Sequence, residues 1–245
     1  MAVAYFCFDA ELNDFLQRHK RQVKIIHNFE ERSSIKDTIE SLGVPHTEVD
    51  CIEVNGEYVN FSYIIQDGDN INVYPISAGI TPNLSVRPEP LNVVKFVLDI
   101  HLGKLATSLR LLGFDTLYRN DYADEELAQV SASESRILLT RDKGLLMRSL
   151  VTYGYYVRST QPQQQIIEVL RRFDLFKIVA PFKRCLRCNG LLQFVSKQSI
   201  VDQLPESVNL QIDEFRRCED CAQIYWKGSH YERLQNMINE IMNNK

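Results

Sequence analysis

Four cysteines and a small set of acidic residues are the side chains whose types and spacing suit chemistry in this sequence. The cysteines form two CxxC pairs separated by 29 residues: Cys185, Cys188, Cys218 and Cys221. Four thiolates in this arrangement are typical of a closed, structural Zn²⁺ site. Redox activity of a CxxC motif is the alternative, but it does not explain the second pair. We therefore expect a zinc ribbon whose folding depends on the metal.

Three aspartates follow short apolar segments that have the pattern of buried strands. Asp99 ends VVKFVLD, Asp124 follows FDTLYR with Asp121 and Glu125 beside it, and Asp142 follows RILLT. Loops and helix N-termini converge at the carboxyl ends of parallel strands, so these carboxylates can meet there. Carboxylates at close range repel unless a cation compensates, and oxygen ligands suit Mg²⁺ or Mn²⁺. The pattern predicts a metal site for phosphodiester hydrolysis.

A structural role is the alternative for these aspartates taken singly. Aspartate is a favoured N-cap residue, and Asp124 and Asp142 each stand where a helical pattern begins. Asp99 is less easily explained as a cap, because Ile100 and His101 do not begin a strong capping motif.

The elements that would position these acids lie between Val93 and about residue 180, where strand and helix patterns alternate. The predicted strands are 93–99, 114–119, 136–140 and 155–159, and the predicted helices are 102–113, 124–135, 142–154 and 161–173. The expected inner face of the first helix consists of Leu102, Leu105, Ala106, Leu109 and Leu112. This alternation indicates an α/β fold with a parallel sheet covered by helices.

The first 76 residues have a different order, with two strands, a helix and then more strands. The helix SSIKDTIESLG has Ser33 or Ser34 as its expected N-cap and Gly43 after its end, and Asn55-Gly56 predicts a hairpin. This order is typical of a β-grasp domain, and IEVNGEYVNFSYIIQDGDNINVYPI resembles the ubiquitin-like sulfur-carrier group. The diglycine tail of such carriers is missing, because the chain continues into a linker with Pro82, Pro88 and Pro90.

Charge is distributed unevenly along the 245 residues, although the net charge is only −4. Residues 1–86 hold 13 acidic and 6 basic side chains, whereas residues 136–188 hold 11 basic and 3 acidic ones. The second segment can face phosphates, or it can be an ordinary solvated surface. Because the sequence contains no apolar run long enough for a membrane span and no secretory signal, we expect a soluble, cytoplasmic protein without a membrane partner.

The segment FVLDIHLGKLATSLRLLGFDTLYRNDYADEELAQVSASESRILLTRDKGLLMR resembles the PIN-like ribonuclease family named after the C-terminal RNase domain of the Mutator-seven exonuclease. The resemblance continues through the CxxC pairs and YWKGSHYERL, and the N-terminal β-grasp domain resembles the two-part form of this family. It implies a catalytic Mg²⁺ or Mn²⁺ site made by Asp99, Asp124 and Asp142, with Asp121 or Glu125 as a further acid. It also implies cleavage of single-stranded RNA.

These observations predict a β-grasp domain (1–78), a linker (79–91), a PIN-like nuclease domain (92–180) and a zinc ribbon with a C-terminal helix (181–245). The predicted function is a metal-dependent endoribonuclease. The cations expected to contact RNA phosphates are Arg141, Lys143, Arg184 and Arg187. The alternative is a non-catalytic RNA-binding adaptor, and in either case the β-grasp domain can dock a protein partner.

Overall fold

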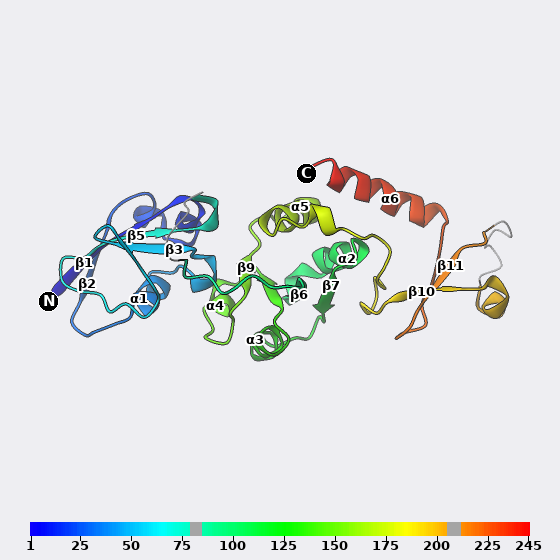
Figure 1. Cartoon of the computed structure of the whole chain (residues 1–245), viewed down its shortest axis with the longest axis horizontal. Coiled ribbons are helices and arrows are strands. Elements are labelled where there is room, and N and C mark those ends of the chain that lie inside the picture. Colours follow the sequence, from blue (N-terminus) through cyan, green and yellow to red (C-terminus); the bar gives the residue numbers. More distant parts are fainter. Residues whose placement is uncertain (79–84, 205–211) are drawn as a thin grey trace. The chain divides into compact units, whose positions relative to one another are not determined.

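The computed structural model describes residues 1–78, 85–204 and 212–245 (Figure 1). Residues 79–84, which include Pro82 of the predicted linker, lie outside the described part. The chain divides into two units that are each discontinuous in sequence. Unit 1 consists of residues 1–93 and 123–156, and unit 2 consists of residues 94–122 and 157–245.

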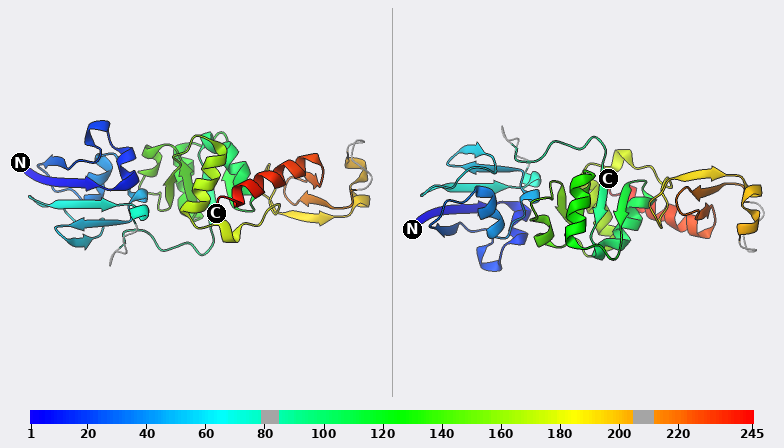
Figure 2. Two further views of the ribbon diagram at one scale, coloured as in Figure 1. Left: turned by 90° about the horizontal axis from the view of Figure 1, so that it is seen from above. Right: turned by 90° about the horizontal axis from the view of Figure 1, so that it is seen from below.

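Unit 1 begins with a five-stranded sheet in the order β2-β1-β5-β3-β4. Its strands are β1 Ala2–Phe8, β2 Ile25–Phe29, β3 Cys51–Val54, β4 Glu57–Val59 and β5 Asn70–Tyr74. The first strand pairs antiparallel with β2 and parallel with β5, which gives the mixed sheet expected of a β-grasp domain. Figure 2 shows these blue and cyan strands side by side.

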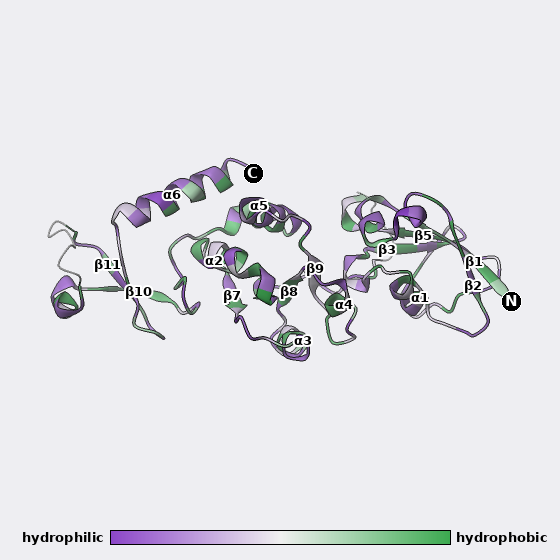
Figure 3. Cartoon of the chain, turned by 180° about the vertical axis from the view of Figure 1, so that it is seen from behind, coloured by the Kyte–Doolittle hydropathy of each residue, from purple (hydrophilic) through white to green (hydrophobic). Residues whose placement is uncertain are grey.

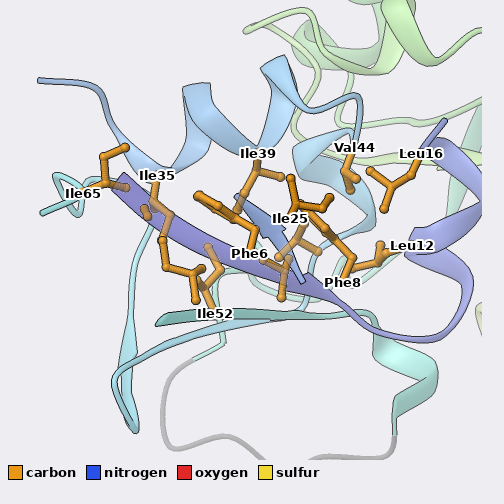
Figure 4. Close-up of a cluster of buried hydrophobic side chains, with 14 of the residues drawn as sticks. Phe6, Phe8, Leu12, Leu16, Ile25, Ile35, Ile39, Val44, Ile52 and Ile65 are labelled. Atoms are coloured by element: carbon orange, nitrogen blue, oxygen red, sulfur yellow. The ribbon is translucent and has the colours of Figure 1, made fainter. Parts of the chain in front are cut away.

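The core of this sheet is built by alternation along β1. Ala4, Phe6 and Phe8 are buried, so every second side chain of the strand points to one face. Helix α1 (Ile35–Ser41) contributes Ile35 and Ile39, which are fully buried and lie against the same face (Figure 4). Burial of these large apolar side chains is the main stabilising contribution to this part of the chain.

Local signals in the sequence set the ends of the β-grasp elements. Ser34 is the N-cap of α1, and its Oγ accepts a hydrogen bond of 3.1 Å from the Asp37 N–H. Gly43, with φ of +107°, follows the end of the helix. Asn55 and Gly56 both have positive φ, at 53° and 93°, as a two-residue type I′ hairpin requires between β3 and β4. The predicted cap and hairpin are therefore confirmed.

Four further elements belong to unit 1. They are α3 Asp124–Ser133, β8 Ile137–Thr140, α4 Lys143–Leu146 and β9 Gly154–Tyr156, and β8 pairs parallel with β9. All four residues of β8 are buried, as expected for a strand of a parallel sheet covered on both faces.

The helix predicted over residues 142–154 is wrong in length, because α4 ends at Leu146. The Met147 N–H is shared between the carbonyl oxygens of Lys143 and Gly144, which tightens the last turn, and the Val151 N–H then closes a separate turn on Arg148. Leu150, which lies within the predicted range of this helix, is 50% exposed.

Unit 2 begins with a parallel strand–helix–strand arrangement. Its elements are β6 Lys95–Leu98, α2 Gly103–Leu111, β7 Asp115–Tyr118 and α5 Pro162–Arg172, and β6 pairs parallel with β7. The predicted inner face of α2 is confirmed, since all five of its residues are at most 1% exposed. Pro162 occupies the first turn of α5, where its missing N–H costs no helical hydrogen bond.

The C-terminal part of unit 2 is a three-stranded antiparallel ribbon followed by a helix. The elements are β10 Leu192–Val195, β11 Phe215–Cys218, β12 Ile224–Trp226 and α6 Ser229–Met242. Figure 3 shows green and purple side by side along α6, which is the pattern of an amphipathic helix, and Ile238 and Ile241 are its buried residues. Short 3₁₀ helices complete the described chain: 10–15, 18–20, 46–48, 76–78, 100–102, 176–178, 197–199 and 201–203.

The predicted fold class is confirmed by these elements: parallel strands with intervening helices, a preceding β-grasp sheet and a following cysteine-bearing ribbon. None of the described helices is both long and apolar enough to cross a bilayer.

Candidate functional site

The four cysteines of the CxxC pairs converge in unit 2. Their Sγ atoms all lie within 4.8 Å of one another. Cys185 Sγ is 3.6 Å from Cys221 Sγ, and Cys188 Sγ is 3.4 Å from Cys218 Sγ. Zinc–sulfur bonds of about 2.3 Å at tetrahedral angles place sulfur atoms about 3.8 Å apart. The donor set and its spacing therefore suit one tetrahedral metal ion with no open coordination position.

The surroundings of this cluster favour ionised sulfur at one position. Burial raises the pKa of Cys185, but hydrogen bonds from Tyr225 Oη and from the backbone N–H groups of Cys188 and Arg187 outweigh it and lower the pKa to about 7. At Cys188 burial dominates and raises the pKa to about 12. Four thiolates this close cannot all be ionised without a cation, so full ionisation of the cluster would require a bound metal ion.

A network of hydrogen bonds joins the first cysteine pair to strand β7. Asn189 Oδ1 accepts from the Thr116 N–H at 2.9 Å, and Asn189 Nδ2 donates to Asp115 Oδ1 at 2.9 Å. Arg110 on α2 donates through Nε to the Thr116 carbonyl oxygen and through Nη1 to the Arg187 carbonyl oxygen. Burial lowers the pKa of Arg110, and its Nε and Nη1 groups donate to these carbonyl oxygens. The loop that carries the first CxxC pair is thus anchored to strand β7 and helix α2 of unit 2.

Asp99 lies directly after β6 and is only 6% exposed. It occupies the N-cap position of the 3₁₀ turn at residues 100–102, but its side chain makes no cap hydrogen bond there. Tyr118, the last residue of β7, donates through Oη to the Ile100 carbonyl oxygen at 2.9 Å and fixes this turn. A Cβ atom at Gly103 would lie 2.7 Å from that hydroxyl oxygen, so the close approach requires glycine. A carboxylate is therefore held at a strand end, as the sequence predicts.

Asp121 is an exposed residue in the segment after β7. Both of its carboxylate oxygens accept from Arg119, at 2.9 Å from Nε and 3.1 Å from Nη2. The hydrogen bonds from Arg119 hold the pKa of Asp121 below its usual range.

Asp124 and Glu125 begin α3 in unit 1 and share one arginine. Arg148 Nη2 lies 2.9 Å from Glu125 Oε1 and 3.8 Å from Asp124 Oδ2. The pKa of Glu125 is lowered by its own backbone N–H and by the Arg148 guanidinium. These two acids lie in the first turn of the helix, where negative charge is favourable.

Asp142 is the N-cap residue of α4. Its Oδ1 accepts from the Gly144 N–H at 2.7 Å, and its own N–H donates to Thr140 Oγ1 at 2.9 Å. The capping role considered for this aspartate is therefore present. One oxygen of a carboxylate can cap a helix while the other serves a ligand, so the cap leaves a metal-binding role open.

The predicted acids are divided between the two units. Asp99 and Asp121 belong to unit 2, whereas Asp124, Glu125 and Asp142 belong to unit 1. Their combination into one metal site stays a prediction.

Comparison with known protein families shows the family to which this chain belongs. The Mut7-C RNAse domain matches residues 94–238, which is more than half of the chain. The chain belongs to the Mut7-C RNAse domain family. Residues 1–81 match the Mut7-C ubiquitin domain, which confirms the predicted two-part architecture. No significant match was found among curated proteins or solved structures.

The cations predicted to contact RNA in this Mut7-C chain have different surroundings. Arg187 and Lys143 are exposed, and Lys143 Nζ lies 3.5 Å from the Phe15 carbonyl oxygen. Arg184 is largely engaged inside unit 2: Nη1 donates to the Asn189 carbonyl oxygen at 2.9 Å, and Nη2 lies 3.5 Å from Asp115 Oδ2. Arg141 is half-buried. Exposure therefore favours Arg187 and Lys143 as phosphate contacts.

Two residues of the Mut7-C region were missed by reasoning from the sequence. Arg148 pairs with acids 23 and 24 positions earlier in the chain, and no local spacing signals such a contact. Asn189 follows the first CxxC pair directly, and its φ of +77° is a conformation that asparagine tolerates better than most residues. An asparagine-glycine dipeptide after a metal-binding knuckle was the available signal for the second case.

Proposed function

We propose that this chain is a metal-dependent endoribonuclease that hydrolyses phosphodiester bonds of single-stranded RNA. The observation that carries the proposal is the match of residues 94–238 to an RNAse domain family, over a region in which acids follow the ends of parallel strands. We further propose domain limits of 1–78, 92–180 and 181–245 with a linker at 79–91, and a structural zinc ion on the four cysteines.

The predicted ligands suit a hard divalent cation, because they offer only carboxylate oxygens. Asp99 would supply a buried oxygen at the end of β6, and Asp124 and Asp142 would supply oxygens at the starts of two helices. Asp121 or Glu125 would add negative charge beside them. When bound, Mg²⁺ or Mn²⁺ supplies Lewis-acid stabilisation for the phosphodiester under attack.

The cations of the chain would orient the substrate for this chemistry. Lys143 and Arg141 flank Asp142 in sequence and would contact backbone phosphates on either side of the scissile bond. Arg187, on the first CxxC pair, would extend the contact along the strand. Phosphate contacts carry little sequence information, so this arrangement fits a nuclease that selects single strands by shape and charge.

Cleavage assays on the full chain test the proposal. Single-stranded RNA is incubated with protein and Mn²⁺, and products are resolved by gel. The variant with both Asp99→Asn and Asp142→Asn should lose cleavage, because asparagine removes the charge while keeping a side-chain oxygen for the Gly144 N–H. Asp174→Asn, at an exposed site paired with Lys177, is the matched control and should cleave normally. Cleavage that persists in the double variant, or without a divalent ion, contradicts the metal site.

The non-catalytic adaptor remains the second candidate because one observation favours it. Asp142 caps α4, and Asp124 and Glu125 pair with Arg148, so structural roles account for contacts of all three acids. An adaptor would bind RNA with the same affinity in the presence and absence of Mn²⁺ and would leave the RNA intact. Its β-grasp sheet would then serve to dock a protein partner.

A further inference from the structure

A cavity of about 160 Å³ lies between the ribbon and the first turns of α6 in unit 2. It is smaller than the roughly 300–1,000 Å³ of sites that enclose drug-sized ligands, so it suits a single ring system. All of its lining residues lie between 181 and 234, within one unit and within the described chain.

One wall of the cavity is aromatic. Phe182 and Tyr231 stack with ring centroids 4.5 Å apart and an interplanar angle of 28°. Trp226 and Leu234 also line the cavity, and Trp226 is half-buried. Flat aromatic surfaces of this kind stack on nucleobases with little dependence on the base.

The rim of the cavity carries more positive than negative charge. Arg184, Arg216 and Lys227 line it, together with a single carboxylate, Glu214. Glu214 forms ion pairs with two of these cations: its Oε2 with Lys227 Nζ, and its Oε1 with Arg216 Nη2 at 3.6 Å. An anionic group of a ligand would therefore compete with the Glu214 carboxylate for these two cations.

We propose that this cavity binds one nucleotide of a single-stranded RNA, with the base on the aromatic wall and a phosphate at Arg216 and Lys227. The proposal rests on the proposed nuclease function, which supplies the ligand class. The aromatic wall alone would accept many apolar groups, but the surplus of cations next to it selects a ligand that joins a flat ring to an anion. Contact here would hold the RNA on the ribbon.

Trp226 is the single tryptophan of the chain, so its fluorescence reports on this cavity directly. The zinc-loaded full chain is titrated with AMP and with a short single-stranded RNA, in buffer without Mg²⁺ or Mn²⁺. Ribose 5-phosphate and inorganic phosphate serve as ligands without a base. The expected result is saturable quenching by both base-containing ligands and none by the other two. Equal responses to AMP and inorganic phosphate overturn the proposal.

Two variants separate the contribution of the base to AMP binding from that of the phosphate. Tyr231→Ala removes part of the stacking surface and should weaken AMP binding by roughly tenfold. Glu214→Gln removes the competing carboxylate and should strengthen AMP binding several-fold, whereas Glu232→Gln, on the exposed part of α6, should leave it unchanged. Weaker AMP binding by Glu214→Gln, or an unchanged affinity of Tyr231→Ala, overturns the proposed arrangement.

The outcome for the cavity is distinguishable from the outcome for the nuclease. An active nuclease whose Trp226 fluorescence does not respond to AMP or to RNA overturns the cavity proposal alone. A chain that binds AMP with the expected variant effects but never cleaves RNA supports the cavity and overturns the nuclease.

Discussion

The β-grasp sheet and the cysteine-bearing ribbon are held together in different ways. The sheet buries a large apolar cluster that includes Phe6, Ile35, Ile39 and Ile52. The described cluster of the ribbon has three buried residues, Ile200, Phe215 and Ile224, with a few half-buried neighbours. A ribbon this small cannot offset its conformational entropy by apolar burial alone. A metal ion held by the four convergent thiols would supply the stabilisation that the apolar residues lack.

This contrast has a consequence for how each region tolerates change. The sheet depends on the volume and shape of its side chains, and it should be indifferent to metal. The ribbon is expected to depend on four sulfur atoms and on the contacts that anchor their loops. It should therefore tolerate changes in its apolar residues better than changes in these cysteines. Three substitutions test the contrast.

Loss of a zinc ligand should have the largest effect. Cys185→Ser leaves three thiolates, and because zinc binding contributes on the order of 10 kcal/mol to the folding of small zinc domains, the ribbon should unfold. Zinc content by atomic absorption and the fluorescence of Trp226 measure the loss. Cys7→Ser, in β1 of the β-grasp sheet, is the matched control and should retain zinc. A Cys185→Ser chain with a native fluorescence spectrum would contradict metal-dependent folding.

Truncation in the β-grasp core should have the next largest effect. Phe6→Ala removes a fully buried ring and should lower the free energy of unfolding by about 3–5 kcal/mol, as measured by urea denaturation. Zinc content should stay the same, because the four cysteines of the CxxC pairs lie in the other unit. Ile26→Ala, on the adjacent strand at a 64% exposed position, serves as control with a change of less than about 1 kcal/mol. Zinc loss in Phe6→Ala would show that the two regions are not independent.

Loosening the anchor of the metal-binding loop should have the smallest effect. Asn189→Gly keeps the positive φ but removes two hydrogen bonds, so it should cost about 1–3 kcal/mol in unit 2. The Thr116 amide, which loses its acceptor, should exchange its hydrogen faster. Asn189→Ala should cost about 1 kcal/mol more, because a Cβ disfavours this backbone conformation. Unchanged exchange at Thr116 would remove Asn189 as the anchor.

Much of the fold follows from local patterns. Neighbouring residues decide the alternation along β1, the Asn55-Gly56 hairpin, the Ser34 cap and the place of Pro162 at the start of α5. The hairpin and the cap are found as predicted. The prediction of a helix over 142–154 failed because spacing alone cannot show that the helix ends at Leu146 and that a separate turn follows at Arg148. Hydrophobic periodicity identifies the buried face of a helix, but it does not fix the residue at which helical hydrogen bonding ends.

The candidate site likewise has features that local spacing predicts and contacts that depend on the completed fold. Cysteine spacing predicts a closed metal cluster, because four ligands in two pairs already define the geometry, and the four sulfur atoms do converge. The contacts of Arg148 and Arg110 could not be predicted in this way. Each depends on elements brought together only by the completed fold, and neither arginine stands at a distinctive spacing in the sequence.

The discontinuity of unit 1 sets an order of events during synthesis. The Glu48 carboxylate accepts from the Tyr156 N–H at 2.7 Å, and His46 Nε2 lies 2.9 Å from the Val151 carbonyl oxygen. At about 5–20 residues per second, a ribosome makes Tyr156 roughly 5–20 s after the 3₁₀ helix 46–48 that holds His46 and Glu48. Throughout that interval Glu48 lacks its Tyr156 contact. The segment 94–122 is made during the same interval, before the residues 157–245 that complete unit 2. The speed of translation therefore sets how long unit 1 stays incomplete.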